Sequence, residues 1–166
     1  MERQSKPRSQ PLDQKTASAL AKQYCLAQPR AHKEVRDKLY ELGAWRNEVE
    51  LAIADMIAEG FLSEERFAMD YISKRFKLYG WGRVKLKKGL RDKSVPDKLI
   101  TQALNSIAQE EYVQALHKHA GKYLRLLKER VNWRRKRKLV DFLLRQGFEY
   151  AVINDALKAY PELPAG

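Results

Sequence analysis

Apolar residues follow a helical spacing through most of the chain, and this spacing recurs three times around a turn-forming anchor residue. The three anchors are Gly43, Ser94 and Gly147, which lie 51 and 53 residues apart. Apolar residues stand four and eight positions before each anchor, and six, nine and ten positions after it. Residues separated by three or four positions share one face of a helix. Each anchor is therefore interpreted as the turn between two amphipathic helices, and the chain as three tandem units.

The pattern predicts three helices in each unit, with the anchor as the turn after the second helix. Glycine permits a left-handed cap at this turn, and in the middle unit Ser94 stands there instead. The predicted helices are 16–27, 30–42, 46–59, 63–78, 81–93, 96–107, 110–128, 133–146 and 149–160. We expect a polar, mobile arm at 1–15, three repeats at 16–60, 61–108 and 109–160, and a short tail at 161–166. The predicted fold is all-α, an elongated and curved array of three tandem three-helix repeats.

Composition supports the helical interpretation. Leu and Ala number 39, whereas Val, Ile and Thr together reach only 16, and Pro96 is the single proline between Arg30 and Tyr160. This balance favours helices over a sheet. The apolar runs are too short for a membrane span, and the polar N-terminus lacks a signal peptide's apolar region. We therefore expect a soluble, monomeric, cytoplasmic protein with no membrane partner.

The chain offers no arrangement of residues typical of catalysis. Gly80-Trp81-Gly82 begins like a dinucleotide-binding motif, but Lys85 occupies the third glycine position and no strand is predicted before it. His117 and His119 are two residues apart, so on a helix they point in different directions and do not hold one metal ion. Cys25 is the single cysteine and is interpreted as a structural thiol. We expect no enzymatic activity, no cofactor and no metal.

Positive charge is concentrated in two stretches. The chain has 33 Lys and Arg against 21 Asp and Glu, a net charge of +12. Residues 74–93 hold nine basic side chains and one acidic residue, and residues 118–138 hold ten and one. A solvated surface normally mixes both signs. The two stretches therefore predict a polyanionic partner.

The second helix of the middle unit is cationic on the face opposite Leu86 and Leu90. The equivalent positions in the other two units combine basic, acidic and uncharged residues, namely Glu34, Arg36, Asp37 and Tyr40 in the first and Lys138, Val140, Asp141 and Leu144 in the third. Like charges at helical spacing repel each other, so a binding role explains this row better than drift on a solvated face. The residues predicted to bind DNA or a protein partner are Lys74, Arg75, Lys77, Arg83, Lys85, Lys87, Lys88 and Arg91, with a second patch of Arg134, Arg135, Lys136 and Arg137.

Three aromatic residues, Tyr79, Trp81 and Trp133, lie beside these basic clusters. They are of a type that stacks on nucleic-acid bases or on a partner surface. A large aromatic side chain near a helix junction more often packs against its own protein, so packing is the favoured interpretation.

Several segments resemble the bacterial RecX regulatory proteins over roughly Thr16 to Tyr160. Trp81 stands where proline is common in that family, and Ser94 where glycine is common. The segments that carry the resemblance are Phe61–Ala68, Tyr71-Ile72, Arg75, Tyr79–Val84, Leu86, Leu90, Ser94-Val95 and Phe142–Phe148.

The resemblance implies a non-enzymatic modulator of the RecA recombinase. Such proteins are arrays of three three-helix repeats that lie in the groove of the RecA–DNA filament. They block filament extension and lower its ATPase, strand-exchange and co-protease activities, which places them in recombination, DNA repair and the SOS response. Family members also bind DNA, single- or double-stranded. The alternative that stays open is a general DNA-binding protein that affects RecA only by competing for DNA.

Overall fold

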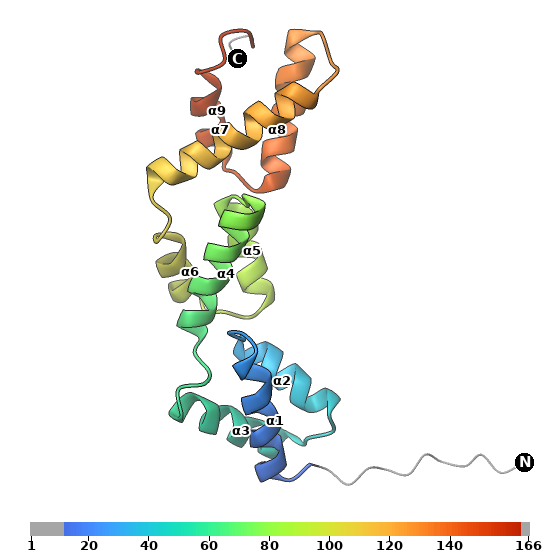
Figure 1. Ribbon diagram of the computed structural model, residues 1–166, viewed down its shortest axis with the longest axis vertical. Helices are drawn as coiled ribbons and strands as arrows, with labels where there is room; N and C mark the ends of the chain where they lie inside the picture. The colour runs from blue at the N-terminus through green and yellow to red at the C-terminus, as the bar shows by residue number, and fades with distance from the viewer. Residues whose placement is uncertain (1–11, 164–166) are drawn as a thin grey trace, which may run out of the picture. The chain divides into compact units, whose positions relative to one another are not determined.

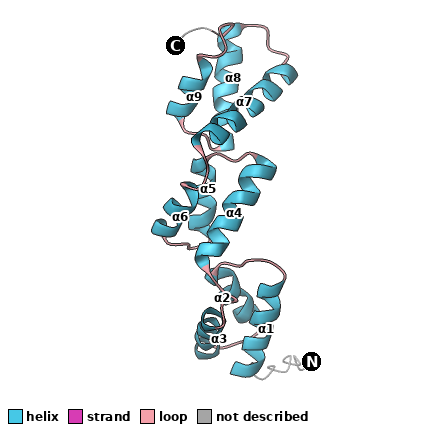
Figure 2. Cartoon of the chain, turned by 60° about the vertical axis from the view of Figure 1, so that its left-hand side comes forward, coloured by secondary structure: helices cyan, strands magenta, loops and turns pink. Residues whose placement is uncertain are grey.

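The computed structural model describes residues 12–163, and in this range the chain is helical with no strand (Figures 1 and 2). The predicted 1–15 arm and 161–166 tail fall largely outside the described residues. The helices are α1 (Gln14–Leu26), α2 (His32–Glu41), α3 (Arg46–Ala58), α4 (Glu64–Tyr79), α5 (Arg83–Asp92), α6 (Asp97–Leu104), α7 (Gln109–Leu126), α8 (Asn132–Gln146) and α9 (Tyr150–Leu157).

Every predicted helix has a counterpart in the described range, and each end lies within three residues of its prediction. The largest differences are at the ends of α6 and α9, which stop three residues early. There the chain leaves the helix through i→i−3 hydrogen bonds, such as Ser106 N–H to the Ala103 carbonyl at 3.2 Å and Ala159 N–H to the Ala156 carbonyl at 3.1 Å. Tightened last turns of this kind are common at helix ends. The all-α repeat array is confirmed, whereas the repeat boundaries stay a prediction.

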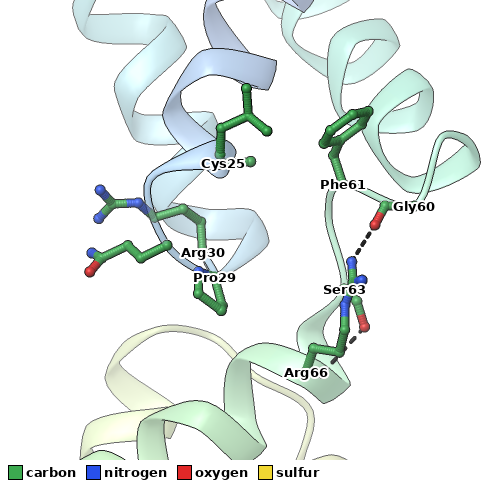
Figure 3. Close-up of a pocket in the computed structure, with 9 residues that line it drawn as sticks. Cys25, Pro29, Arg30, Gly60, Phe61, Ser63 and Arg66 are labelled. Carbon is green, nitrogen blue, oxygen red and sulfur yellow. Dashed lines mark hydrogen bonds between the residues drawn. The ribbon is translucent and has the colours of Figure 1, made fainter.

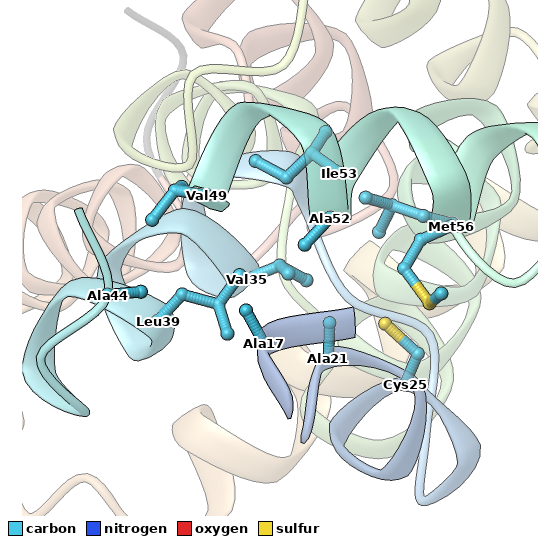
Figure 4. Close-up of a cluster of buried hydrophobic side chains, with 11 residues drawn as sticks. Ala17, Ala21, Cys25, Val35, Leu39, Ala44, Val49, Ala52, Ile53 and Met56 are labelled. Atoms are coloured by element: carbon cyan, nitrogen blue, oxygen red, sulfur yellow. The ribbon is translucent and has the colours of Figure 1, made fainter. Parts of the chain in front are cut away.

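The chain divides into two compact units. The N-terminal unit ends at Phe67 and the C-terminal unit begins at Ala68, so α4 starts in one unit and continues in the other. The core of the N-terminal unit is formed by small and branched side chains of α1, α2 and α3, including the fully buried Ala17, Val35 and Leu39 (Figure 4). Cys25 is buried in this core, and burial raises the pKa of its thiol. The prediction of a structural thiol fits this placement.

The three anchor residues adopt the same backbone conformation. Gly43, Ser94 and Gly147 have φ angles of +89°, +60° and +93°, all in the left-handed region. The next residue returns a hydrogen bond to a buried leucine each time, and the three pairs are Ala44 N–H to Leu39 at 3.0 Å, Val95 N–H to Leu90 at 3.2 Å and Phe148 N–H to Leu143 at 3.1 Å. This arrangement is typical of a Schellman turn. The turn predicted at each anchor is therefore present, and it is left-handed at Ser94 as well as at the two glycines.

Ser94 is the non-glycine member of this set, and its left-handed backbone carries strain that glycine lacks. We expect Ser94→Gly to raise the free energy of unfolding of the C-terminal unit by roughly 0.5–1 kcal/mol, because relief of strain exceeds the added entropy of the unfolded chain. Urea unfolding followed by circular dichroism measures the change.

The matched control is the reverse change in the N-terminal unit. A Cβ at residue 43 meets no heavy atom within 4 Å, so Gly43→Ala tests the backbone effect alone. We expect it to lower the free energy of unfolding by about 1 kcal/mol. Equal stability of S94G and the parent protein would show that Ser94 is not strained.

Candidate nucleoprotein-binding surface

The predicted basic residues lie on α4, α5 and α8, all within the C-terminal unit. Leu86 and Leu90 are completely buried and fix the inner face of α5 in the core, while Lys88 and Arg91 are exposed and Lys85 and Lys87 are half-buried. The period of α5 therefore places its lysines where the sequence predicts them, away from the leucines.

A close backbone contact positions α5. Gly82 N–H donates to the Gln146 carbonyl at 2.8 Å, and Val84 N–H donates to the Gly147 carbonyl at 3.0 Å. A Cβ at residue 82 would overlap the backbone of Gly147 and Phe148, so only glycine permits this approach. The N-terminal end of α5 is thereby fixed to the turn between α8 and α9.

Tyr112 of α7 stabilises the same junction from inside. Its side chain is fully buried and packs between the rings of Phe76 and Phe148, with ring centroids 6.1 and 5.2 Å away. Its hydroxyl accepts a hydrogen bond from Arg83 N–H at 2.9 Å and donates one to Glu149. Burial, followed by the neighbouring Glu149 carboxylate, raises the pKa of Tyr112, so the phenol stays protonated and able to donate.

Arg83 belongs to this junction more than to a free surface. Its guanidinium lies over the Tyr112 ring at 4.1 Å, donates to the Gln109 side chain at 3.1 and 3.2 Å, and lies 3.9 Å from a Glu149 oxygen. This network was not predicted from the sequence, because the residues that its hydrogen bonds join are 26 to 37 positions apart. The one signal of this network in the sequence was Tyr112 itself, an aromatic residue with a hydroxyl group near the predicted start of a helix.

Two other predicted binding residues are paired with carboxylates. Arg91 donates two hydrogen bonds to Asp97, both at 2.9 Å, and Lys74 lies 2.9 Å from Asp70. The bidentate hydrogen bonds from Arg91 hold the pKa of Asp97 below its usual range. The cationic face predicted on α5 thus includes one residue, Arg91, whose charge is paired with a carboxylate. Asp97 opens the helix that follows the Ser94 turn, so its position could have indicated the pair.

Four lysines of this surface form no ion pair in the described range, although Lys87 is close enough to Asp97 to help lower the pKa of that carboxyl. Among residues 12–163, no carboxylate forms an ion pair with Lys77, Lys85, Lys87 or Lys88. Arg75 is held by aromatic rings instead, with its guanidinium carbon 5.1 to 5.5 Å from the ring centroids of Tyr71, Tyr79 and Trp81. We call Lys85, Lys87 and Lys88 the α5 lysine row.

The second basic patch lies at the opposite end of α8 from the junction. Nine to twelve helical residues separate Arg134–Arg137 from Gln146, which corresponds to roughly 15 Å along the helix axis. Arg134 lies over Trp133, with its guanidinium carbon 5.1 Å from the ring centroid, while Arg135 is half-buried and donates to the Glu129 carbonyl at 3.5 Å. The structure thus does not merge the two predicted patches into one cluster.

The aromatic residues beside the patches are more exposed than the sequence analysis expected. Tyr79 is 53% exposed and Trp133 is 56% exposed, whereas Trp81 is half-buried. Each ring nevertheless has a neighbour in its own protein, since the Tyr79 and Trp81 ring centroids are 6.2 Å apart and the Arg134 guanidinium lies over Trp133. That these rings pack against their own protein rather than bind a partner stays a prediction.

A cavity of about 370 Å³ lies in the N-terminal unit, between the turn after α1 and the segment that enters α4 (Figure 3). Both arginines that line the cavity have partners within the protein. Arg30 stacks on the Tyr24 ring at 3.9 Å, and Arg66 donates to the Gly60 carbonyl. Since its charged groups have partners within the protein, we assign the cavity no ligand.

The described residues contain no group of three or more His, Cys, Asp or Glu side chains that could hold a metal ion. Likewise, no helix in the range 12–163 has the length and apolar character needed to cross a membrane.

The junction network predicts the effect of removing one hydroxyl. Tyr112→Phe keeps the ring packing but leaves Arg83 N–H and the Glu149 carboxylate without their common partner. We expect the free energy of unfolding to fall by about 1–2 kcal/mol, measured by urea denaturation. Tyr150→Phe is the control, because that side chain is 64% exposed and its change should stay within about 0.5 kcal/mol.

The burial of His119 leads us to expect that the stability of the C-terminal unit depends on pH. The His119 side chain packs against Gly80, and burial, followed by nearby Lys118 and Lys122, lowers its pKa below the usual histidine value of about 6.5. The unfolded chain therefore binds the proton more readily, so the stability contributed by neutral His119 is present above pH 6.5 and is lost as pH falls below it. Unfolding experiments between about pH 5 and 8 should show this loss in the parent protein and in H117Q, and a smaller loss in H119Q.

Comparison with known proteins identifies the family of this scaffold. Two RecX family models match the chain, the second three-helix domain at residues 63–104 and the third three-helix domain at residues 109–157. The regulatory protein RecX of Pelodictyon phaeoclathratiforme is 33% identical over 125 residues, covering 75% of this chain and 76% of that protein. RecX of Chlorobaculum tepidum is 30% identical over 146 residues, covering 87% and 89%.

RecX of Bacillus licheniformis is 31% identical over 146 residues, and the match covers 88% of this chain but only 56% of that protein. Among solved structures, RecX from Lactobacillus salivarius superposes with a TM-score of 0.81 at 22% identity, covering 88% of this chain and 95% of that one. A second regulatory protein RecX superposes with a TM-score of 0.82 at 21% identity, covering 87% and 73%. These two structures share the fold. The sequence matches and family models together show that the chain belongs to the RecX family.

Proposed function

We propose that this protein inhibits the RecA recombinase by binding the filament that RecA forms on DNA. Binding blocks filament extension and lowers the ATPase, strand-exchange and co-protease activities. The observation that carries the proposal is the α5 lysine row, three cations outside the buried face of Leu86 and Leu90, with no ion pair to a carboxylate in the described range. Relatives of this chain bear the name regulatory protein RecX, which supports a regulatory role.

The cost of the lysine row supports a binding role. Lys85 and Lys88 are three positions apart, so they share a face of α5 and repel each other. Lys85 also lies near the start of α5, where positive charge opposes the helix dipole. Leu86 and Leu90 hold the inner face of α5 in the core, so packing of the helix does not require a row of positive charges. A polyanionic filament relieves the repulsion when it binds.

The proposed mechanism is positional rather than catalytic. The glycine contact and the Tyr112 network hold α5 rigidly, so its lysines meet the partner without a prior ordering cost. The patch at Arg134–Arg137 is proposed as a second contact, separate from the first along α8. The protein acts as a cytoplasmic monomer in this proposal, with no cofactor.

Charge reversal of the α5 lysine row tests the proposal. We expect the triple variant K85E/K87E/K88E to lose at least about tenfold in inhibition of RecA ATPase on single-stranded DNA, at physiological salt, because three attractive contacts become repulsive. The helical circular dichroism should remain that of the parent protein.

The matched control is K15E/R46E/K98E, which changes the net charge by the same amount at three exposed positions on α1, α3 and α6. We expect it to inhibit nearly as well as the parent protein. Equal loss in both triple variants would mean that only net charge matters, and full inhibition by K85E/K87E/K88E would remove α5 from the mechanism.

The same assay separates filament binding from competition for DNA. A competitor must occupy the DNA sites, so it inhibits only when its concentration approaches that of the sites. Its DNA affinity would also fall steeply with salt, with a logarithmic slope of about −0.7 per neutralised phosphate on a single strand. Inhibition at substoichiometric amounts, with DNA sites in excess, would support binding to the filament itself.

A further inference from the structure

A groove between α7 and α9 is apolar and open to solvent. It has a volume of about 620 Å³, and five of its nine lining residues are alanine or valine. These five are Val113, Ala151, Val152, Ala156 and Ala159, of which only Ala156 is buried. A volume of this size lies in the range of ligand-binding sites in proteins. We call this site the α7–α9 groove.

The core of the C-terminal unit does not use the surface of the groove. α7 buries Tyr112 and Leu116, and α9 buries Ile153. Val113 and Val152 are each one position away from these buried residues, so they lie at the edge of the core and are half-buried. Packing of the two helices against each other therefore leaves an apolar surface uncovered.

The corresponding helices of the N-terminal unit are joined in a different way. Between α1 and α3, Ser18 Oγ donates to Asp55 at 2.9 Å, and Lys22 Nζ donates to Glu59 at 3.0 Å. Polar side chains thus bridge the first and third helices there, whereas alanine and valine border the α7–α9 groove. An apolar groove is therefore a feature of the C-terminal unit and not a requirement of the three-helix scaffold.

A side-chain contact marks one end of the groove. His117 lines the groove, and its Nδ1 lies 3.1 Å from the Tyr160 hydroxyl, which donates to the His117 carbonyl at 3.4 Å. Burial, followed by the Glu162 carboxylate, raises the pKa of Tyr160, so the phenol stays protonated and able to donate. Gln109, which lines the other end, is separated from His117 by roughly 12 Å along the helix axis. The groove therefore has room for about two turns of a bound helix.

The charge around the groove is opposite to that of the rest of its unit. Residues 109–117 and 149–163 hold five acidic residues and one basic residue, whereas residues 68–108 and 118–148 hold five acidic and 21 basic residues. A unit with this much positive charge repels cations over most of its surface. The segments that form the groove are therefore the part of the unit that attracts a cationic partner.

Carboxylates lie near both ends of the groove. Glu110 is three positions before Val113 and shares its helix face, and Glu162 lies at the other end, two residues after the tyrosine whose pKa it raises. Neither forms an ion pair with another described residue, whereas Asp155, between them, is paired with a lysine at 2.7 Å. Glu110 also stabilises the start of α7 through the helix dipole, but Glu162 follows the last described helix and has no such role.

We propose that the α7–α9 groove is a docking site for a short basic amphipathic segment of a partner protein. The segment places apolar side chains against Val113 and Val152, and its lysine or arginine side chains beside Glu110 and Glu162. An amphipathic helix in an apolar groove is a common mode of peptide recognition. The carboxylates repel DNA and acidic peptides from this site. The proposal goes beyond the proposed function, because no residue of the α5 lysine row or of Arg134–Arg137 lines the groove.

A fluorescein-labelled peptide of leucine and lysine, patterned as an amphipathic helix, tests the site on the full chain. Because the chain carries a net charge of +12, nonspecific attraction does not favour this probe. We expect fluorescence anisotropy to show binding, and an NMR titration to shift amide signals of α7 and α9. A scrambled peptide of the same composition should bind at least about tenfold more weakly, since it cannot present an apolar face.

Charge reversal at the two ends of the groove tests the role of the carboxylates. We expect E110K/E162K to weaken binding of the leucine–lysine peptide at least about tenfold, because two attractive contacts become repulsive. The matched control is D37K/D141K, which changes the net charge by the same amount at two exposed carboxylates outside the groove. We expect the control to weaken binding less than about twofold, because salt screens distant charges.

Filling the groove tests its apolar surface separately. Ala151 lines the groove and is exposed, so Ala151→Trp should occupy the groove without disturbing the core. We expect this variant to keep the helical circular dichroism of the parent protein and to bind the peptide at least about tenfold more weakly.

The proposal fails if the parent protein does not bind the peptide, or if E110K/E162K or A151W binds it as tightly as the parent protein. An equal loss in D37K/D141K also overturns it, since only net charge would then matter. Self-association of the parent protein that E110K/E162K abolishes in analytical ultracentrifugation would make a second copy of the chain the occupant instead. The RecA ATPase test of K85E/K87E/K88E does not involve these residues, so either proposal can fail while the other stands.

Discussion

The contact between Gly82 and Gly147 is the constraint on which the C-terminal unit depends. Two backbone hydrogen bonds at 2.8 and 3.0 Å join the start of α5 to the turn after α8, at a separation that no side chain at residue 82 permits. Tyr112 fills the space behind this contact and satisfies the first N–H group of α5. The orientation of the α5 lysine row is therefore set by backbone contacts at the Gly147 turn, against which the backbone and Cβ of Lys85 also lie.

The parts of the fold that could be predicted from the sequence are those set by interactions between residues close together in the chain. The turn at Ser94 was predictable because the leucine four residues before it and the alanine nine residues after it repeat those around Gly43 and Gly147, whereas its left-handed conformation without a glycine was not. The helix ends were less predictable, since the last turns of α6 and α9 tighten into i→i−3 hydrogen bonds that the apolar pattern does not encode. The Tyr112 network joins residues up to 37 positions apart, and no periodic pattern reports such a contact.

In the candidate site, too, the helix faces could be predicted from the sequence but the contacts between distant residues could not. Spacing alone placed the α5 lysines opposite Leu86 and Leu90, but it could not show which cations have partners. Arg91 is neutralised by Asp97 across the turn, while Arg75 is restrained by three rings and keeps its charge. Two arginines in one predicted patch thus differ in the electrostatic potential they present, and only their neighbours in space decide which of them can attract an anion.

A comparison of the two helix junctions shows how one scaffold position can carry different chemistry. His32 and Arg83 are the first residues of α2 and α5, and Glu64 and Gln109 are the first residues of the helices that follow each three-helix stretch. His32 Nδ1 lies 3.7 Å from a Glu64 oxygen, just as the Arg83 guanidinium lies 3.1 Å from the Gln109 oxygen.

The contact between helix starts is therefore repeated, but its electrostatics is not. The His32–Glu64 contact pairs an imidazole with a carboxylate, whereas the Arg83 guanidinium has a neutral amide as its nearest partner and a Glu149 carboxylate oxygen at 3.9 Å. The second junction thus holds α5 in place through a guanidinium that lies between an amide and a carboxylate, so the residue at the start of α5 contributes more to the rigidity of the surface than to its positive charge.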